Sequence, residues 1–221
     1  MQNQVTAIYN GLQALGLEGE VRSDLSSRLM YATDASIYRE EPLAVVFPHH
    51  KEDIKKLLAF AVKHGIGIIP RAAGTSLAGQ VVGSGIIADL SRHFGNILDI
   101  NVQERWVRLE PGVVPDELNE ILRDHGLFFG PETSTSNRCN MGGMIGNNGC
   151  GLHSLVYGSV RDHIIEVKAL LHDGSEVVFG ELTEEHYRRK CTLENAEGDI
   201  YREIEDILSD AANRESIMRD Y

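Results

Sequence analysis

Several features that mark particular protein classes are missing from this sequence of 221 residues. It has only three cysteines, Cys139, Cys150 and Cys191, and no two of them form a CxxC pair. No iron–sulfur or zinc site can therefore be read from the chain. The odd cysteine count favours reduced thiols and predicts a cytoplasmic location. No apolar run approaches the ~20 residues that span a bilayer, and the polar N-terminus lacks a signal-peptide core.

Basic residues are also scarce. Lys and Arg total 21 against 33 Asp and Glu, which gives a formal net charge of -12. Nucleic acid is therefore not an expected partner, because phosphate contacts require clustered positive charge. The same balance argues against docking on anionic membranes, and any anionic cofactor must be held by local groups against the overall field.

The first part of the chain shows a strand–helix–strand pattern. Apolar residues at helical spacing predict a short N-terminal helix, and 43–47, 66–69 and 86–90 are predicted buried strands. Between the first two strands, residues 51–64 form a predicted helix that ends at Gly65. Its apolar face is predicted to comprise Ile54, Leu57, Leu58, Ala61 and Val62. This βαβ pattern predicts a parallel sheet.

The second part alternates hairpins and helices. Residues 97–101 and 106–110 suit one antiparallel hairpin, and 164–171 and 176–179 suit another around the turn 172–175. Helices are predicted over 115–125 and 199–218. We therefore predict the α+β class with two lobes. A small βαβ lobe reaches about Leu90, and a larger mixed antiparallel lobe covers about 91–221.

A run of small residues, which we call the first glycine segment (70–80), follows the second predicted strand. Residues without branching at Cβ let its backbone turn tightly, so successive N–H groups can point at one anion. Hydroxyls and one arginine add further donors, as a pyrophosphate requires. The candidate ligands are Pro70, Arg71, Ala72, Ala73, Gly74, Thr75, Ser76, Gly79 and Gln80. A flexible surface loop is the alternative, and the segment matches neither a Walker A motif nor a Rossmann fingerprint.

The second glycine segment (140–151) is denser and has five glycines in the ten residues 142–151. Glycine is unfavourable inside regular elements, so such a run predicts a loop whose backbone touches a ligand or another backbone. Asn147 and Asn148 tolerate left-handed turns and can both donate and accept hydrogen bonds. A packing hinge between the lobes is the alternative. Tyr157 is either part of the same site or a core aromatic.

Taken in order, these segments resemble the FAD-binding domain of the vanillyl-alcohol oxidase / p-cresol methylhydroxylase superfamily. The likeness covers about 150 residues. It begins at the Tyr-x-x-Asp-x-Ser pattern of 31–36 and runs through both glycine segments and Tyr157-Gly158 to the Asp173-Gly174 hairpin. Within the superfamily the chain is most similar to the branch of D-lactate dehydrogenase, glycolate oxidase and D-2-hydroxyglutarate dehydrogenase. The acidic segment after the hairpin is similar to large bacterial members that carry an iron–sulfur domain.

The resemblance implies noncovalent FAD, because Thr75 stands near the position where some members have a histidine that attaches the flavin. It implies that the first glycine segment contacts the pyrophosphate. It also implies that the rest of FAD is lined by Pro131, Glu132, Thr133, Ser134, Met141, Gly142, Gly143, Gly146, Asn147, Asn148, Gly149, Gly151, Tyr157 and Gly158. No catalytic residue can be assigned. None of the nine histidines stands in a motif that marks a base.

The resemblance also implies an activity. A flavin dehydrogenase of this branch oxidises a 2-hydroxy acid by hydride transfer to flavin, and its electrons leave through an acceptor outside this chain. Members of the family continue into a cap domain, so we expect the chain to be the N-terminal part of a longer protein, with any iron–sulfur cluster in the remainder. Two alternatives stay open. One is a non-catalytic FAD or nucleotide-binding module, and the other is an NADPH-using FAD reductase of cell-wall precursor type.

Overall fold

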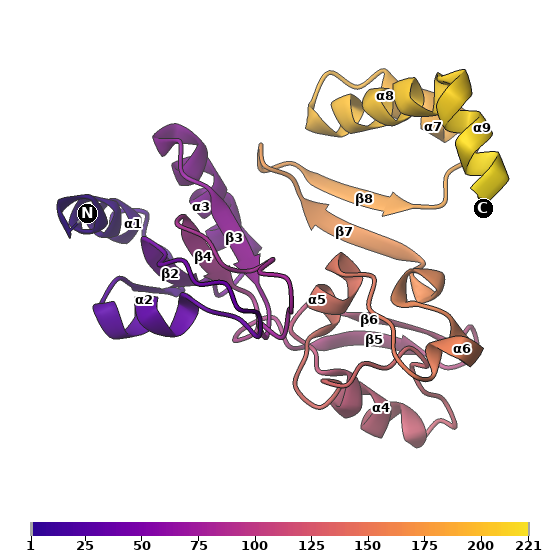
Figure 1. Ribbon diagram of the computed structural model, residues 1–221, viewed down its shortest axis with the longest axis horizontal. Helices are drawn as coiled ribbons and strands as arrows, with labels where there is room; N and C mark the ends of the chain where they lie inside the picture. The colour runs from indigo at the N-terminus through magenta and orange to yellow at the C-terminus, as the bar shows by residue number, and fades with distance from the viewer. Residues whose placement is uncertain (1, 221) are drawn as a thin grey trace. The chain divides into compact units, whose positions relative to one another are not determined.

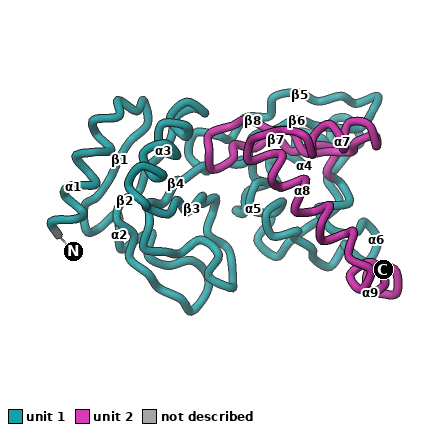
Figure 2. Tube along the Cα trace, turned by 90° about the horizontal axis from the view of Figure 1, so that it is seen from above, with its two compact units in different colours: residues 1–163 teal, residues 164–221 magenta. Residues whose placement is uncertain are grey.

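The computed structural model describes residues 2–220, which fall into two compact units, residues 1–163 and 164–221. Figure 2 distinguishes the two units by colour. Helices and strands are mixed along the chain, and the predicted α+β class is confirmed. The lobe boundary near Leu90 stays a prediction.

A four-stranded sheet with the order β1-β2-β4-β3 organises the first part of unit 1 (Figure 1). Its strands are β1 (Glu20–Arg22), β2 (Ala44–Phe47), β3 (Ile68–Arg71) and β4 (Ile86–Asp89). The strand β4 pairs in parallel with both β2 and β3, so the predicted parallel βαβ sheet is confirmed. The short antiparallel edge strand β1 was not predicted.

Strand position in the sheet follows the residue pattern. All four residues of β2 and of β4 are buried, as continuous apolar runs favour in central parallel strands. The strand β3 includes Pro70 and is partly exposed at the sheet edge, where a missing N–H is tolerated. It begins two residues later than predicted, because the Ile66 N–H donates to the Ala61 carbonyl at 3.0 Å and so belongs to the helix end.

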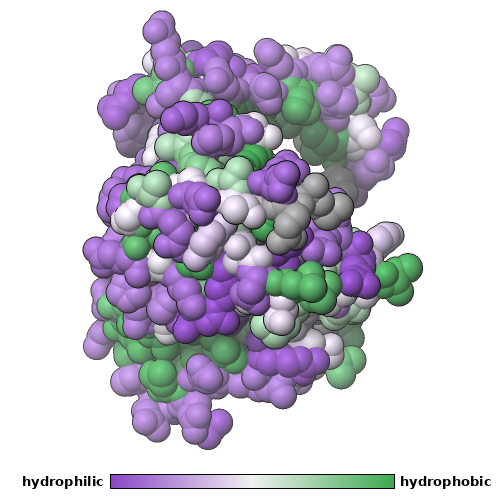
Figure 3. Space-filling model, turned by 90° about the vertical axis from the view of Figure 1, so that its left-hand side faces the viewer, coloured by the Kyte–Doolittle hydropathy of each residue, from purple (hydrophilic) through white to green (hydrophobic). Residues whose placement is uncertain are grey.

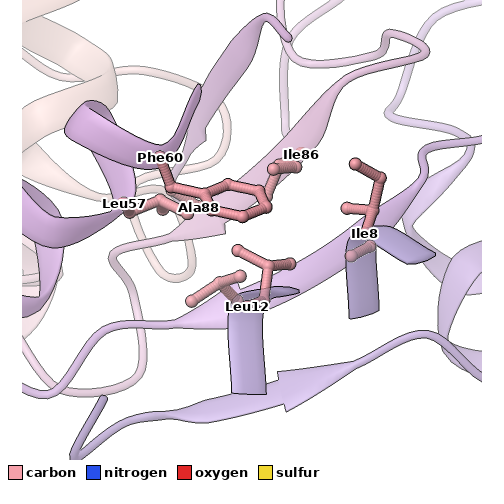
Figure 4. Close-up of a cluster of buried hydrophobic side chains, with 8 residues drawn as sticks. Ile8, Leu12, Leu57, Phe60, Ile86 and Ala88 are labelled. Atoms are coloured by element: carbon pink, nitrogen blue, oxygen red, sulfur yellow. The ribbon is translucent and has the colours of Figure 1, made fainter. Parts of the chain in front are cut away.

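Helix α3 (Lys51–His64) has the predicted bounds and ends at Gly65, whose φ of 62° lies in the left-handed region. Its predicted apolar face is wrong at one position. Val62 is 66% exposed, whereas Phe60 is buried beside Leu57. The buried stripe repeats at three and four residues, and Val62 lies outside it. Phe60 and Leu57 pack against Ile8 and Leu12 of α1 (Gln2–Gln13) and against Ile86 and Ala88 of β4 (Figure 4).

The rest of unit 1 begins with the predicted hairpin, formed by β5 (Ile97–Asn101) and β6 (Trp106–Leu109). Helix α4 (Pro115–Arg123) follows and ends two residues before the predicted position. The Leu127 N–H donates to the Leu122 carbonyl at 3.1 Å and closes the helix end, while Gly126 has φ 66°. Three short helical elements were not predicted: α2 (Leu25–Tyr31), α6 (Ser154–Tyr157) and η1 (Val160–His163).

The second glycine segment was predicted to be a loop, and this prediction is wrong in part. Met141–Gly146 forms the short helix α5. Met141 and Met144 are buried and anchor it. Gly142 donates its N–H to the Pro111 carbonyl at 2.8 Å, and a Cβ on Gly142 would stand 2.4 Å from Pro111 Cβ. Glycine is required there by backbone packing, which outweighs its poor helix propensity.

Unit 2 consists of the predicted hairpin and three helices. The hairpin strands are β7 (Glu166–Leu170) and β8 (Glu176–Gly180). The helices are α7 (Glu184–Cys191), α8 (Ala196–Ser209) and α9 (Ala211–Asp220). The single helix predicted over 199–218 is therefore wrong, because extended backbone at Asp210 divides it.

The surface drawn in Figure 3 is mostly hydrophilic, with hydrophobic residues in separate groups. Within residues 2–220, no helix combines the length and the apolar character that crossing a membrane demands.

Candidate functional site

A cavity of about 1100 Å³ opens in unit 1, and every residue that lines it lies between residues 30 and 149. Both glycine segments contribute to its walls. The predicted site residues that line it are Pro70, Arg71, Ala72, Ala73, Gly74, Thr75, Ser76, Gln80, Thr133, Ser134, Gly142, Gly143, Gly146, Asn147 and Gly149. Segments far apart in sequence thus enclose one space.

Unpaired main-chain donors run along one wall of the cavity. The backbone N–H groups of residues 72–77 donate to no acceptor within the described chain, and all of these residues line the cavity. Polar main-chain groups normally find a partner in protein, water or ligand. A wall of free N–H groups therefore suits a ligand rich in acceptor oxygens.

Side chains connect the two glycine segments at the cavity rim. Gln80 donates from Nε2 to Asn147 Oδ1 at 3.3 Å. The Ser76 hydroxyl donates to Gln80 Oε1, so it is already engaged. Thr75 is not bonded in this way, which leaves its hydroxyl as the more available side-chain donor of the segment.

Glycines keep the cavity open where the two segments approach. A Cβ on Gly143 would stand 3.6 Å from Ala72 Cβ, across the gap between the segments. A Cβ on Gly146 would meet nothing within 4 Å. Larger side chains at either position would extend into space next to the cavity wall.

Arg71 provides a cation at this wall. Its guanidinium carbon lies 5.0 Å from the Tyr31 ring centre, and Nη1 donates to the Tyr31 carbonyl at 3.3 Å. The Tyr31 hydroxyl donates to Asp89 Oδ2 at 2.5 Å. Burial and this hydrogen bond to Asp89 raise the pKa of Tyr31, so the phenol stays neutral and remains a donor.

Eight predicted site residues do not line this cavity: Gly79, Pro131, Glu132, Met141, Asn148, Gly151, Tyr157 and Gly158. Several of them have packing roles in the described chain. Met141 is 4% exposed in the core, and a Cβ on Gly151 would stand 1.9 Å from the Glu132 carbonyl oxygen. Gly79 lies under the Tyr38 ring, and Asn148 accepts from the Arg161 N–H at 3.0 Å with φ 44°. Cofactor contact by these eight residues stays a prediction.

Five residues with hydroxyl, amide or charged side chains line the cavity without having been predicted as ligands. They are Thr33, Asp34, Thr135, Arg138 and Asn140. Asn140 donates from Nδ2 to the Gly112 carbonyl at 2.7 Å, while its Oδ1 and Asp34 Oδ2 are buried and have no partner in the described chain. A sequence signal existed for Arg138, which is the only charged residue between positions 133 and 151. An isolated charged residue next to the second glycine segment indicates a candidate anion ligand.

The class of protein follows from comparison with known families. A family model described as an FAD binding domain matches residues 42–180, which is more than half of the chain. The chain belongs to this FAD-binding family, and FAD is its cofactor. The matched range includes both glycine segments.

Two of the most similar relatives are bacterial D-2-hydroxyglutarate dehydrogenases. The chain is 39% identical over 199 residues to a D-2-hydroxyglutarate dehydrogenase of Pseudomonas putida, a match that covers 89% of this chain and 20% of that protein. It is 43% identical over 176 residues to the Escherichia coli D-2-hydroxyglutarate dehydrogenase, covering 77% of this chain and 17% of that one. The chain thus spans about a fifth of the length of these relatives.

Solved structures share the fold at lower identity. An alkyldihydroxyacetonephosphate synthase superposes with a TM-score of 0.68 and 19% identity, over 80% of this chain and 34% of that one. The 6-hydroxy-D-nicotine oxidase of Arthrobacter nicotinovorans gives 0.65 and 23%, over 75% and 36%. These likenesses show the fold alone.

Proposed function

We propose that the cavity of unit 1 holds FAD, with the pyrophosphate on the free N–H groups of residues 72–77 and beside Arg71. That run of main-chain donors without protein acceptors is the observation that carries the proposal. The cavity volume of about 1100 Å³ suits a large organic cofactor. The same wall includes Gly143 and Gly146, which have no side chains, and Thr75, whose hydroxyl is a further hydrogen-bond donor.

We further propose that the protein is an FAD-linked oxidoreductase that acts on a 2-hydroxy acid. The names of the similar D-2-hydroxyglutarate dehydrogenases and of a 31% identical glycolate oxidase subunit of Bacillus subtilis support this substrate class. FAD supplies the hydride acceptor for such an oxidation. The electron acceptor or iron–sulfur domain is proposed to lie outside this chain, and the cytoplasmic location remains a prediction.

Titration with FAD tests the cofactor site directly. The 221-residue chain should quench flavin fluorescence and become yellow after gel filtration, whereas a colourless chain without quenching would contradict the proposal. Gly143→Leu places a side chain into the gap facing Ala72 and suits helical backbone. A clash of about 1–3 kcal/mol corresponds to an affinity loss of roughly fivefold to 150-fold. Gly67→Leu is the control, because Gly67 has open space and does not line the cavity.

A second candidate is a binding module without chemistry of its own. No histidine is found among the residues that line the cavity, and Asp34 is its one carboxylate. Turnover separates the two candidates. FAD-loaded protein is mixed with D-2-hydroxyglutarate, D-lactate or glycolate and a dye acceptor. Dye reduction supports the dehydrogenase, and stable FAD binding without turnover supports the module.

A further inference from the structure

Arg71 is half-buried at the cavity wall, and the structure orients it without a counter-ion. Its guanidinium faces the Tyr31 ring on one side. The guanidinium also lies against Gly74, where a Cβ would come within 2.5 Å of Nη2. Its partners in the described chain are this ring and the Tyr31 carbonyl oxygen, and no carboxylate pairs with it. The positive charge is therefore fixed in place but not cancelled.

Tyr31 is itself held from two directions. Its hydroxyl donates to Asp89, a residue only 4% exposed that also accepts from the Ser91 N–H at 2.8 Å and hydroxyl at 2.6 Å. Its ring meets the Phe47 ring edge-on, with 5.8 Å between centres. Asp89 stands beside Arg71 in the parallel pairing of β3 and β4. Tyr31 thus spans from the sheet to the base of the first glycine segment.

We propose that Tyr31, fixed by Asp89, is a positioning residue that presents Arg71 to the diphosphate of a bound nucleotide cofactor. The inference deepens the proposed function and rests on it. A carboxylate partner would orient the guanidinium but also neutralise its charge and occupy its donors. An aromatic face orients a cation through the ring quadrupole and leaves the N–H groups at its edge free for phosphate oxygens.

Calorimetric titration with ADP tests the inference, because ADP carries the diphosphate without the flavin. The variants of the whole chain are Tyr31→Leu, Arg71→Met and the double variant. Arg71→Met should lower ADP affinity by roughly tenfold or more, and Tyr31→Leu should lose nearly as much. The double variant should bind about as well as Arg71→Met, because Tyr31 acts through Arg71. Losses that add in the double variant would overturn the inference.

Two further variants separate positioning from general damage. Tyr31→Phe keeps the ring face and loses only the bond to Asp89, so it should recover most of the affinity lost in Tyr31→Leu. Tyr9→Leu removes a half-buried tyrosine that does not line the cavity, and it should bind ADP like the wild type. An equal loss in Tyr9→Leu would assign the effect to folding and reject the inference.

The remaining outcomes distinguish failure of the proposed function from failure of the positioning role alone. A wild-type chain that binds neither ADP nor FAD defeats the proposed function itself. A wild-type chain that binds both, with Tyr31→Leu unchanged, defeats the positioning role alone. If Tyr31→Leu does not fold, Tyr31→Met, which also removes the ring face but fills more of its volume, takes its place in the cycle with Arg71→Met, and an ADP affinity equal to that of the wild type would reject the inference.

Discussion

Two glycines of the second glycine segment differ in the space that surrounds them. A Cβ on Gly151 would stand 1.9 Å from the Glu132 carbonyl oxygen, which is main chain and cannot rotate away. A Cβ on Gly146, at the end of α5, would meet nothing within 4 Å. The same residue type therefore serves close backbone packing at one position and open space at the other.

Gly151→Ala should lower the free energy of unfolding by about 1–3 kcal/mol or more, because two backbone segments must separate. Gly146→Ala should cause no such loss, since alanine is the better helix former. Urea denaturation of both variants measures the difference. Equal stability of the two would show that the Glu132 segment moves aside freely.

Asp53 is a fully buried carboxylate that orders the start of α3. It accepts from the main-chain N–H groups of Gly19 and His49, both at 2.9 Å, and of Glu18 at 3.1 Å. Burial raises the pKa of Asp53, but the three main-chain hydrogen bonds outweigh it, and the net pKa is lowered. The charged form is therefore the stable one in the folded protein.

Asp53→Asn should destabilise the fold by about 2–4 kcal/mol near neutral pH, because an amide cannot accept equally from three donors. A lowered folded pKa contributes stability above the unfolded value near 3.9, and this contribution is lost as pH falls through the folded pKa. Stability of the wild type should thus fall more steeply with acid below about pH 4 than that of the variant. Parallel curves from thermal unfolding at several pH values would contradict this assignment.

The sequence predicted the main-chain part of the candidate site better than its side chains. A run of small residues after a strand is a local signal, so Ala72 to Ser76 could be chosen from the sequence. Thr33 and Thr135 reach the cavity only through the tertiary fold, which no local pattern encodes, whereas Arg138 had a signal as the one charged residue between positions 133 and 151. Gly151 is a predicted ligand that packs closely against the Glu132 carbonyl, and a high density of glycines does not distinguish ligand contact from backbone packing, so its contact with the cofactor stays a prediction.

Elements with strong periodicity were predicted with accurate bounds, and weak ones were missed. Helix α3 matches residue for residue because its capping residues and apolar stripe agree. The strand β1 has three residues, too few for a readable alternation. Helix α5 forms although three of its six residues are glycines, which disfavour helix. It forms because Met141 and Met144 anchor it in the core and Gly142 fits against Pro111. Tertiary packing there overrides propensity.

The division between α8 and α9 depends on one cap. Asp210 adopts extended backbone with ψ 125°, and its Oδ1 accepts from the Asn213 N–H at 3.0 Å. Asp210→Ala should remove about 1 kcal/mol of capping and speed amide exchange in the first turn of α9. Asp206→Ala, within α8, is the control and should leave those amides unchanged. Equal exchange in the two variants would show that the cap contributes nothing.

At the scale of the whole molecule, the cavity departs from the overall charge. The chain carries a formal net charge of -12, yet the charged residues lining the cavity are two arginines, Arg71 and Arg138, and one aspartate, Asp34. Distant acidic residues are screened beyond about 8–10 Å at physiological ionic strength. Local cations and oriented N–H groups therefore determine whether an anion binds, and an acidic protein can hold a diphosphate.

The two compact units give the last prediction. All cavity-lining residues belong to residues 1–163, whereas Val177 is a buried valine of β8 in unit 2. Val177→Ala should cost about 2 kcal/mol in the stability of unit 2, seen as faster amide exchange in β8, with ADP affinity unchanged.

Val160→Ala is the matched control, because Val160 is buried in unit 1 and its Cγ2 lies 3.6 Å from where a Cβ of Gly149 would stand. That variant should lose stability to a similar degree and also weaken ADP binding, since Gly149 lines the cavity. A large loss of ADP affinity in Val177→Ala would mean that the cofactor site depends on the packing of unit 2.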